Sequence, residues 1–258
     1  MCQLLGLSFN VPVRPEISFR GFMRRGASNP DGWGLALYPD GRAAQVFKEP
    51  VAAGESRLAE FIRDYPGLSS KIFIGHVRVA SSGGQGYEDT HPFERALGGA
   101  DYVFAHNGTL RGFKREEPGG LTPLGRTDSE WAFCRILDWL SLKGGRAWSG
   151  RAYGELEKVL GRLNALGNFN VLMSDGSRLF CYHDQGGYNG LSYVRREFAH
   201  TRIRLKDEDW EVDLGRTKKP GQKGYVIATK PLTDEQWAMF PPGRLFVFED
   251  GEIVHGPK

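Results

Sequence analysis

Short apolar runs recur along the chain and are separated by glycine, proline and aspartate, a pattern typical of a protein rich in β-strands. Three of the separators are Asp-Gly pairs, Asp40-Gly41, Asp175-Gly176 and Asp250-Gly251, and each lies between two apolar runs. Asp-Gly pairs favour the tight turns of β-hairpins. The pattern therefore predicts three hairpins and mostly antiparallel sheets.

The first apolar run begins at once after the N-terminus, and the others follow at short intervals. Residues 3–9 are expected to form a buried strand that holds the N-terminus in the fold. The other expected strands are 35–38, 43–48, 71–77, 102–105, 169–174, 178–182, 191–196, 224–229, 245–249 and 252–255.

Helical spacing of apolar residues appears in four segments, residues 15–25, 55–65, 128–142 and 152–166. Either the Thr or the Asp of Thr127-Asp128 is expected to cap the third helix. Strands outnumber helices and do not alternate with them one for one, so the sequence predicts an α+β fold with two packed sheets. There is no internal repeat or convincing linker. We therefore expect one domain over residues 1–258, with residues 215–224 as an exposed connection.

Composition excludes several classes of protein. The chain has 34 Lys and Arg against 31 Asp and Glu, a net charge of +3, and no basic block longer than a pair. That distribution is too dispersed for a nucleic-acid surface. The three cysteines show no spacing typical of disulfides or metal sites. No signal-peptide pattern or long apolar segment is present, so a cytoplasmic protein without a membrane partner is expected.

Candidate chemistry begins at the N-terminus with Met1-Cys2. Removal of the initiator methionine, which is expected before a residue as small as cysteine, would leave Cys2 with a thiol and a free α-amino group. An α-amine has an ordinary pKa of about 7.7 to 8.0 and a thiol one of about 8.5, so the amine can accept the thiol proton. Cys2 is therefore a candidate nucleophile that carries its own base.

An arginine near the middle of the first half could bind a carboxylate. Arg78 follows a predicted strand and precedes Ser81, another hydroxyl residue and two glycines. The planar guanidinium matches the two oxygens of a carboxylate. The alternative is a surface arginine before a flexible loop.

Asn107 and Gly108 come directly after an apolar strand, and Asp128 begins a predicted helix. A side-chain amide beside a glycine N–H can form an oxyanion hole, and a carboxylate can pair with a substrate ammonium. The alternatives are an ordinary Asn-Gly turn and a plain helix cap.

Three histidines, His76, His91 and His106, lie near these segments. They lack the spacing of zinc ligands on a common helix, so we expect no metal site. Structural histidines with satisfied hydrogen bonds are the better interpretation.

Taken together, these segments resemble the class II glutamine amidotransferases, which are N-terminal nucleophile hydrolases. The motifs are the N-terminal cysteine, Arg25-Gly26, Asp31-Gly32-Trp33-Gly34, Gly-His-x-Arg at 75–78, His-Asn-Gly at 106–108 and Thr-Asp-Ser-Glu at 127–130. The likeness covers the whole chain and is greatest to the stand-alone, YafJ-type branch. It implies a four-layer αββα sandwich of two mostly antiparallel sheets between helices.

The resemblance also implies roles. Cys2 would be the nucleophile, Asn107 and Gly108 the oxyanion hole, and Arg78 and Asp128 the ligands of the α-carboxylate and α-ammonium of the substrate. The other candidate contributors are Ser81 on the substrate and Arg25, Trp33, His76 and His106 in the surrounding loops.

The implied reaction is hydrolysis of the γ-amide of glutamine to glutamate and ammonia through a Cys2 thioester, with no cofactor. A separate synthase subunit could accept the ammonia. Many synthase-linked members have Trp where this chain has Val79 and Thr where it has Ser81, whose hydroxyl can still donate. Two alternatives stay open: a hydrolase of other γ-glutamyl amides or peptides, of the ergothioneine-pathway or glutathione-degradation type, and a non-catalytic subunit that binds γ-glutamyl groups.

Overall fold

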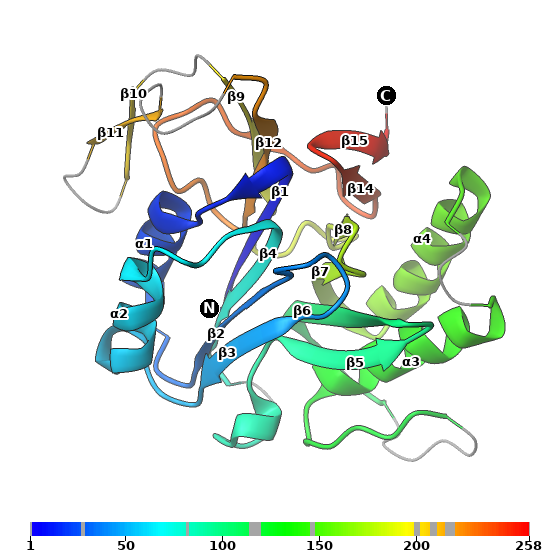
Figure 1. Cartoon of the computed structure of the whole chain (residues 1–258). Coiled ribbons are helices and arrows are strands. Elements are labelled where there is room, and N and C mark those ends of the chain that lie inside the picture. Colours follow the sequence, from blue (N-terminus) through cyan, green and yellow to red (C-terminus); the bar gives the residue numbers. More distant parts are fainter. Residues whose placement is uncertain are drawn as a thin grey trace.

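Two antiparallel sheets lie face to face at the centre of the structure, with one pair of helices outside each sheet (Figure 1). The structure is a computed structural model. It describes residues 2–26, 29–80, 83–113, 120–144, 148–198, 202–206, 211–214 and 220–257.

The first sheet has seven strands in the order β13-β9-β12-β1-β4-β2-β3. Its strands in chain order are β1 (Gln3–Val13), β2 (Trp33–Leu37), β3 (Gln45–Glu49), β4 (Ser70–Val77), β9 (Ser192–Glu197), β12 (Lys223–Ala228) and β13 (Ala238–Met239).

The second sheet has six strands in the order β15-β14-β8-β7-β6-β5. These are β5 (Phe93–Leu97), β6 (Ala100–Leu110), β7 (Gly167–Ser174), β8 (Arg178–Tyr182), β14 (Leu245–Glu249) and β15 (Glu252–His255). A separate two-stranded sheet consists of β10 (Arg202–Arg204) and β11 (Glu211–Asp213).

Helices α1 (Glu16–Arg25) and α2 (Arg57–Asp64) pack on the first sheet, and α3 (Asp128–Leu142) and α4 (Gly150–Asn164) pack on the second. Two short 3₁₀ turns, η2 (Ala53–Glu55) and η3 (Tyr87–Asp89), lie in connections. The αββα sandwich expected from the resemblance is confirmed. None of the helices in the described part of the chain combines the length and the apolar character that crossing a membrane requires.

Strand β1 shows why the chain folds in layers. Leu5 and Leu7 face the helices and pack with Phe19 of α1, whereas Leu4 faces the second sheet. A side chain at Gly6 would have its Cβ 3.1 Å from Leu179 of the second sheet, so the glycine lets the two sheets approach closely. Both faces of β1 are buried from Gln3 to Phe9, and this stretch is mostly apolar, with Gln3 and Ser8 as the polar residues. Burial on both sides fixes the position of the residue that precedes it, Cys2.

Most predicted elements are confirmed, and α3 has the predicted bounds. The position of Asn107-Gly108 was predicted wrongly: these residues lie inside β6 and pair with β7, so they are not in a turn. The first predicted hairpin is correct in its pairing, but residues 38–44 form a longer loop between β2 and β3 than an Asp-Gly turn. Strand β5 was not predicted. Of the expected connection at 215–224, residues 215–219 lie outside the described residues.

Candidate active site

Cys2 lies directly before β1, beside the end of β4. In the register of these strands Gln3 is opposite Val77, which places Cys2 next to the residues that follow β4. The Val79 N–H donates to Cys2 Sγ over 3.2 Å, and the thiol donates to the Val79 carbonyl over 3.3 Å. One residue of the neighbouring strand end thus holds the sulfur atom.

The carbonyl oxygen of Cys2 accepts hydrogen bonds from two side-chain amides. Asn107 Nδ2 on β6 donates to it over 2.9 Å and Asn189 Nδ2 over 3.1 Å. Leu4, the second residue of β1, donates its N–H to Thr229 Oγ1 over 2.8 Å. The backbone around Cys2 is therefore held from both sheets.

Burial raises the pKa of the Cys2 thiol, and the Val79 N–H and the positive charge of Arg78 offset part of that effect. A buried thiol ionises less readily than an exposed one because the charged form loses its hydration. A nucleophile in this environment needs a base close to it.

A small cavity lies against Cys2. Its volume is about 20 Å³, which is room for about one water molecule. The residues that line it are Cys2, Arg78, Val79, His91, His106, Gly108, Thr127, Asp128 and Ser129. The structure therefore brings the predicted nucleophile, guanidinium and carboxylate to one cavity.

Arg78 is buried at the end of β4, with 3% of its surface exposed. Its Nη1 donates to the Gly84 carbonyl over 2.8 Å and, more weakly, to the Asp31 carbonyl over 3.4 Å. Gly84 is itself held by the buried carboxylate of Asp89, which accepts the Gly84 N–H over 2.5 Å and the Arg126 N–H over 2.5 Å. A chain of hydrogen bonds thus fixes the guanidinium at the cavity wall.

Asp128 is the first residue of α3, and Thr127 is its cap, since Thr127 Oγ1 accepts the Glu130 N–H over 3.1 Å. The Asp128 side chain is buried, and its Oδ2 accepts the Leu110 N–H over 2.6 Å. An acidic residue at this position also complements the helix dipole. The carboxylate therefore joins the start of α3 to the end of β6.

His106 lines the cavity beside Gly108. Its Nε2 faces the Asn168 carbonyl at 3.0 Å and its Nδ1 faces Ser129 Oγ at 2.8 Å. A carbonyl can only accept, so Nε2 carries the proton and Nδ1 accepts the Ser129 hydroxyl. Burial lowers the pKa of His106, so the ring is neutral. A Cβ on Gly108 would come 1.9 Å from Asn168 O, so only glycine fits there.

His76 and His91 are buried together, with ring centroids 4.3 Å apart. Burial and the nearby Arg78 charge lower the pKa of His76 to about 3, and burial lowers that of His91 well below its ordinary value. The expectation of satisfied hydrogen bonds holds for His106 but not for His91, whose ring nitrogens have no partner among the described residues. Across those same residues, no group of three or more His, Cys, Asp or Glu could hold a metal ion.

Other candidate residues lie elsewhere. Arg25 donates to the carbonyls of Lys230 and Pro231 over 2.7 and 2.6 Å and does not line the cavity. Trp33 is the first residue of β2 and is fully buried in the core. The expected loop position was wrong for it, and also for Arg25 in α1, His76 in β4 and His106 in β6. Ser81 lies outside the described residues.

Sequence reasoning missed two residues that contact the backbone of Cys2 and Leu4, Asn189 and Thr229. Asn189 precedes a glycine, and this Asn-Gly pair signals a turn but gives no indication that the turn lies beside Cys2. Thr229 follows β12, which pairs with β1 only in the folded protein.

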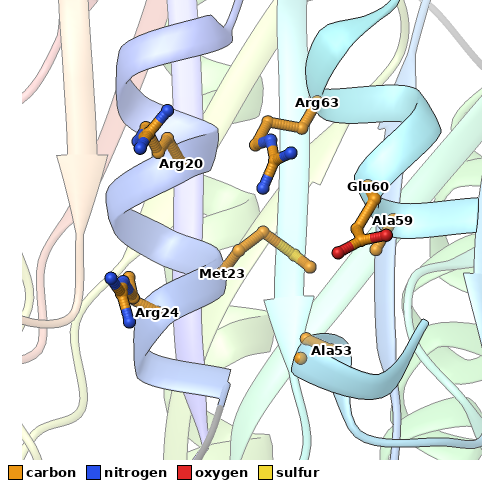
Figure 2. Close-up of a pocket in the computed structure, with 8 residues that line it drawn as sticks. Arg20, Met23, Arg24, Ala53, Ala59, Glu60 and Arg63 are labelled. Carbon is orange, nitrogen blue, oxygen red and sulfur yellow. The ribbon is translucent and has the colours of Figure 1, made fainter. Parts of the chain in front are cut away.

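A larger hollow lies between α1 and α2 and has a volume of about 280 Å³ (Figure 2). It is lined by Arg20, Met23, Arg24, Ala53, Gly54, Ala59, Glu60 and Arg63. Figure 2 shows Arg63 reaching between the two helices, above Met23. None of the lining residues is a cysteine, serine or histidine, so we place the reaction at the cavity beside Cys2.

Comparison with known proteins shows the family to which the chain belongs. The family model of the class-II glutamine amidotransferases matches residues 1–257. YafJ of Escherichia coli (strain K12) is 36% identical over 98% of this chain and its own full length. MJ1515 of Methanocaldococcus jannaschii, an uncharacterized protein, is 43% identical over all of this chain and 72% of its own length.

A solved structure is also similar, that of a predicted glutamine amidotransferase from Pseudomonas aeruginosa PA01. The TM-score is 0.74 at 31% identity, over 98% of this chain and all of the other. The expected likeness to the stand-alone, YafJ-type branch is confirmed. This chain belongs to the class-II glutamine amidotransferases.

Proposed function

We propose that this protein hydrolyses the γ-amide of glutamine to glutamate and ammonia through a γ-glutamyl thioester on Cys2. One observation carries the proposal: the Cys2 thiol, the Arg78 guanidinium and the Asp128 carboxylate line one cavity. These are the groups that a γ-glutamyl amide needs, because its reactive carbonyl is attached to an amino acid that bears an ammonium and a carboxylate.

The first step needs a base, because burial raises the pKa of the Cys2 thiol. Once Met1 is removed, the α-amine of Cys2 takes the thiol proton, and the thiolate attacks the amide carbon. The Val79 N–H, which faces Sγ at 3.2 Å, stabilises the thiolate. The ammonium then returns the proton to the leaving nitrogen, which departs as ammonia. Water hydrolyses the thioester and restores the thiol.

Asn107 and Gly108 are proposed to bind the oxyanion that forms during the attack. Asn107 Nδ2 already donates to the Cys2 carbonyl at 2.9 Å, and its contact with Thr229 Oγ1 is long, at 3.5 Å. An amide nitrogen carries two hydrogens, so the one that makes only the long contact is proposed as the donor to the oxyanion. Gly108 lines the cavity, so its backbone N–H is proposed as the second donor.

The two charged groups are proposed to bind the head of the substrate, Arg78 the α-carboxylate and Asp128 the α-ammonium. A cavity of about 20 Å³ is too small for glutamine, so the groups that line it must move apart as substrate enters. The steps use only groups of the chain and water. Ammonia would be released or passed to a separate synthase subunit. A reducing compartment such as the cytoplasm suits a thiolate nucleophile.

Steady-state kinetics on the mature protein test the proposal with glutamine, a γ-glutamyl dipeptide and butyramide. We expect release of ammonia from glutamine, no turnover by Cys2→Ala, and little cleavage of butyramide because it lacks the charged head. Faster release of an amino acid from the dipeptide than of ammonia from glutamine would reassign the enzyme to γ-glutamyl peptides. Equal cleavage of butyramide would contradict the assigned pocket.

A further inference from the structure

We infer that Asn189 is a positioning residue of this active site, which holds the Cys2 carbonyl through Nδ2 and accepts the α-amino group of mature Cys2 on Oδ1. The role of Asn189 in catalysis rests on the proposed function, in which the α-amine of Cys2 is the base. The inference extends that function by naming the group that orients the base.

The Nδ2 contact is fixed by chemistry. The Cys2 carbonyl is an acceptor and lies 3.1 Å from this end of the Asn189 amide, so the nitrogen and not the oxygen must face it. The same carbonyl accepts Asn107 Nδ2 over 2.9 Å, which uses both of its lone pairs. Asn189 therefore presents its Oδ1 beside Cys2, away from the carbonyl.

The Oδ1 atom of Asn189 is buried and has no hydrogen-bond partner among the described residues, although the residue as a whole is partly exposed. A buried acceptor without a donor is unfavourable, so such an atom calls for a donor that appears at another stage. Removal of Met1 creates one, because an amide nitrogen with a single N–H becomes an amine with two, or an ammonium with three.

The covalent spacing within Cys2 allows this new donor to reach Oδ1. The α-nitrogen and the carbonyl oxygen of Cys2 are separated by only two carbon atoms, and the two ends of the Asn189 amide by one. Since one end of the amide contacts the carbonyl, the other end lies within reach of the α-nitrogen. Asn189 can thus bridge the two backbone polar groups of Cys2 with one side chain.

The backbone at Asn189 is held in an unusual conformation for this purpose. Its φ is +55°, between Gly187 and Gly190, which both have φ of +72°. Among residues with a side chain, asparagine is one of the few that adopts this region readily. Residues in such conformations persist where the surroundings impose them.

The surroundings do impose it, through a buried carboxylate. Asp184 Oδ2 accepts the N–H groups of Gly186 and Tyr188 over 2.8 and 3.1 Å. Asn170 Nδ2 of β7 donates to the Tyr188 carbonyl over 2.6 Å. The residue before Asn189 is therefore anchored at both its N–H and its C=O, which directs the Asn189 side chain at Cys2.

The consequence concerns the direction of the lone pair. A neutral amine has two N–H groups and one lone pair, and the lone pair must face Sγ to accept the thiol proton. An acceptor for one N–H removes the free rotation of the amine about its bond to Cα. The same acceptor stabilises the ammonium that the proton transfer creates.

The test measures the α-amine directly, without turnover. Mature protein labelled with [¹⁵N]cysteine is titrated by NMR, and the Cys2 nitrogen is followed through its chemical shift. Asn189→Gly keeps the positive φ without strain but removes the amide. We expect the pKa of the α-amine to fall by about one to two units, the size of one hydrogen bond to a charged group. Asn189→Asp has nearly the same shape and should raise the pKa of the α-amine. This second variant tests the inference if the glycine variant does not fold.

Asp250→Gly is the matched control, because Asp250 is the other described non-glycine residue with a positive φ, +48°, and it lies in the β14–β15 turn. It should leave the pKa of the α-amine unchanged. An α-amine pKa that is the same in the parent and both Asn189 variants would overturn the inference. Turnover of glutamine with no dependence of this pKa on residue 189 would leave only the proposed function standing. A pKa of the α-amine that depends on residue 189 in a protein that does not turn over glutamine would support the inference and contradict the proposed function.

Discussion

Asn107 on the second sheet donates to the carbonyl oxygen of Cys2, the residue directly before the first sheet, over 2.9 Å. This hydrogen bond joins the two layers of the sandwich at the cavity. The residue assigned to the oxyanion hole therefore also fixes the backbone of the nucleophile.

Replacement of Asn107 by alanine should lower kcat by about 10²- to 10³-fold, since loss of one oxyanion donor has that effect. The Michaelis constant should change less, because the donor acts on charge that develops in the transition state. Steady-state kinetics with glutamine measure both. A kcat equal to that of the parent would limit Asn107 to a structural role.

N-terminal processing should be required for activity, because the nitrogen of a Met1-Cys2 peptide bond is not a base. Intact mass should show a mature chain without Met1, and iodoacetamide should modify Cys2 first. Cys134 and Cys181 are fully buried, and burial raises the pKa of Cys134 to about 11 and that of Cys181 well above its usual range. Both should therefore react slowly. Full activity in chains shown to retain Met1 would disprove the mechanism.

Asp128→Asn should lower kcat/KM at least about tenfold for every γ-glutamyl substrate. A tenfold loss corresponds to about 1.4 kcal/mol of transition-state stabilisation. The asparagine oxygen can still accept the Leu110 N–H, so the change removes the charge and keeps the link to β6. Thermal unfolding of the variant is the control for structure. Loss of activity toward glutamine alone would point away from a shared binding site for the substrate head.

Arg78→Lys should have an effect of similar size, because lysine keeps the charge and loses the planar two-point geometry. It also loses part of the bonding to the Gly84 carbonyl. The measurement is kcat/KM for glutamine and for a γ-glutamyl dipeptide, and both should fall in proportion. A variant as active as the parent on both substrates would exclude Arg78 as the carboxylate ligand.

Stability should fall as the pH drops below the ordinary histidine pKa of about 6.5. Burial lowers the pKa of His76, His91 and His106 in the folded protein, so in acid the unfolded chain binds protons that the folded chain does not. Each histidine then removes about 1.4 kcal/mol per pH unit. Urea unfolding at several pH values measures the slope. His91→Gln should reduce this slope by the amount that corresponds to about one proton. An unchanged slope would show that His91 is protonated in the folded protein as well.

Elements at the centre of the fold were predictable because their burial requires apolar residues at regular positions in the sequence. The apolar run after Cys2 predicted β1, and the helical spacing of apolar residues predicted α3. Strand β5 was not predictable, because it is an edge strand with Glu94 and Arg95 at its centre. Asn107-Gly108 was expected directly after a strand, yet pairing with β7 extends β6 through both residues.

The site was predictable only in part. Cys2, Arg78 and Asp128 were proposed from residue chemistry and a resemblance, and the fold brings them to one cavity. Their mutual distances could not be read from the chain, because they depend on the register of β1 against β4 and on where α3 begins. Asn189 carries no local pattern that points to Cys2, since a buried carboxylate in the preceding loop sets its direction.

The partners of Cys2 have a consequence for synthesis of the chain. Val79, Asn107 and Asn189 lie 77, 105 and 187 positions after it in sequence. The ribosome makes the N-terminus first, at about 5–20 residues per second, so the nucleophile emerges many seconds before the last residue that holds it. During that interval the thiol and the chain terminus are accessible to processing enzymes and oxidants. Nascent chains that end before residue 189 would carry a Cys2 whose carbonyl lacks one of its two side-chain donors, so full anchoring of the nucleophile requires most of the chain.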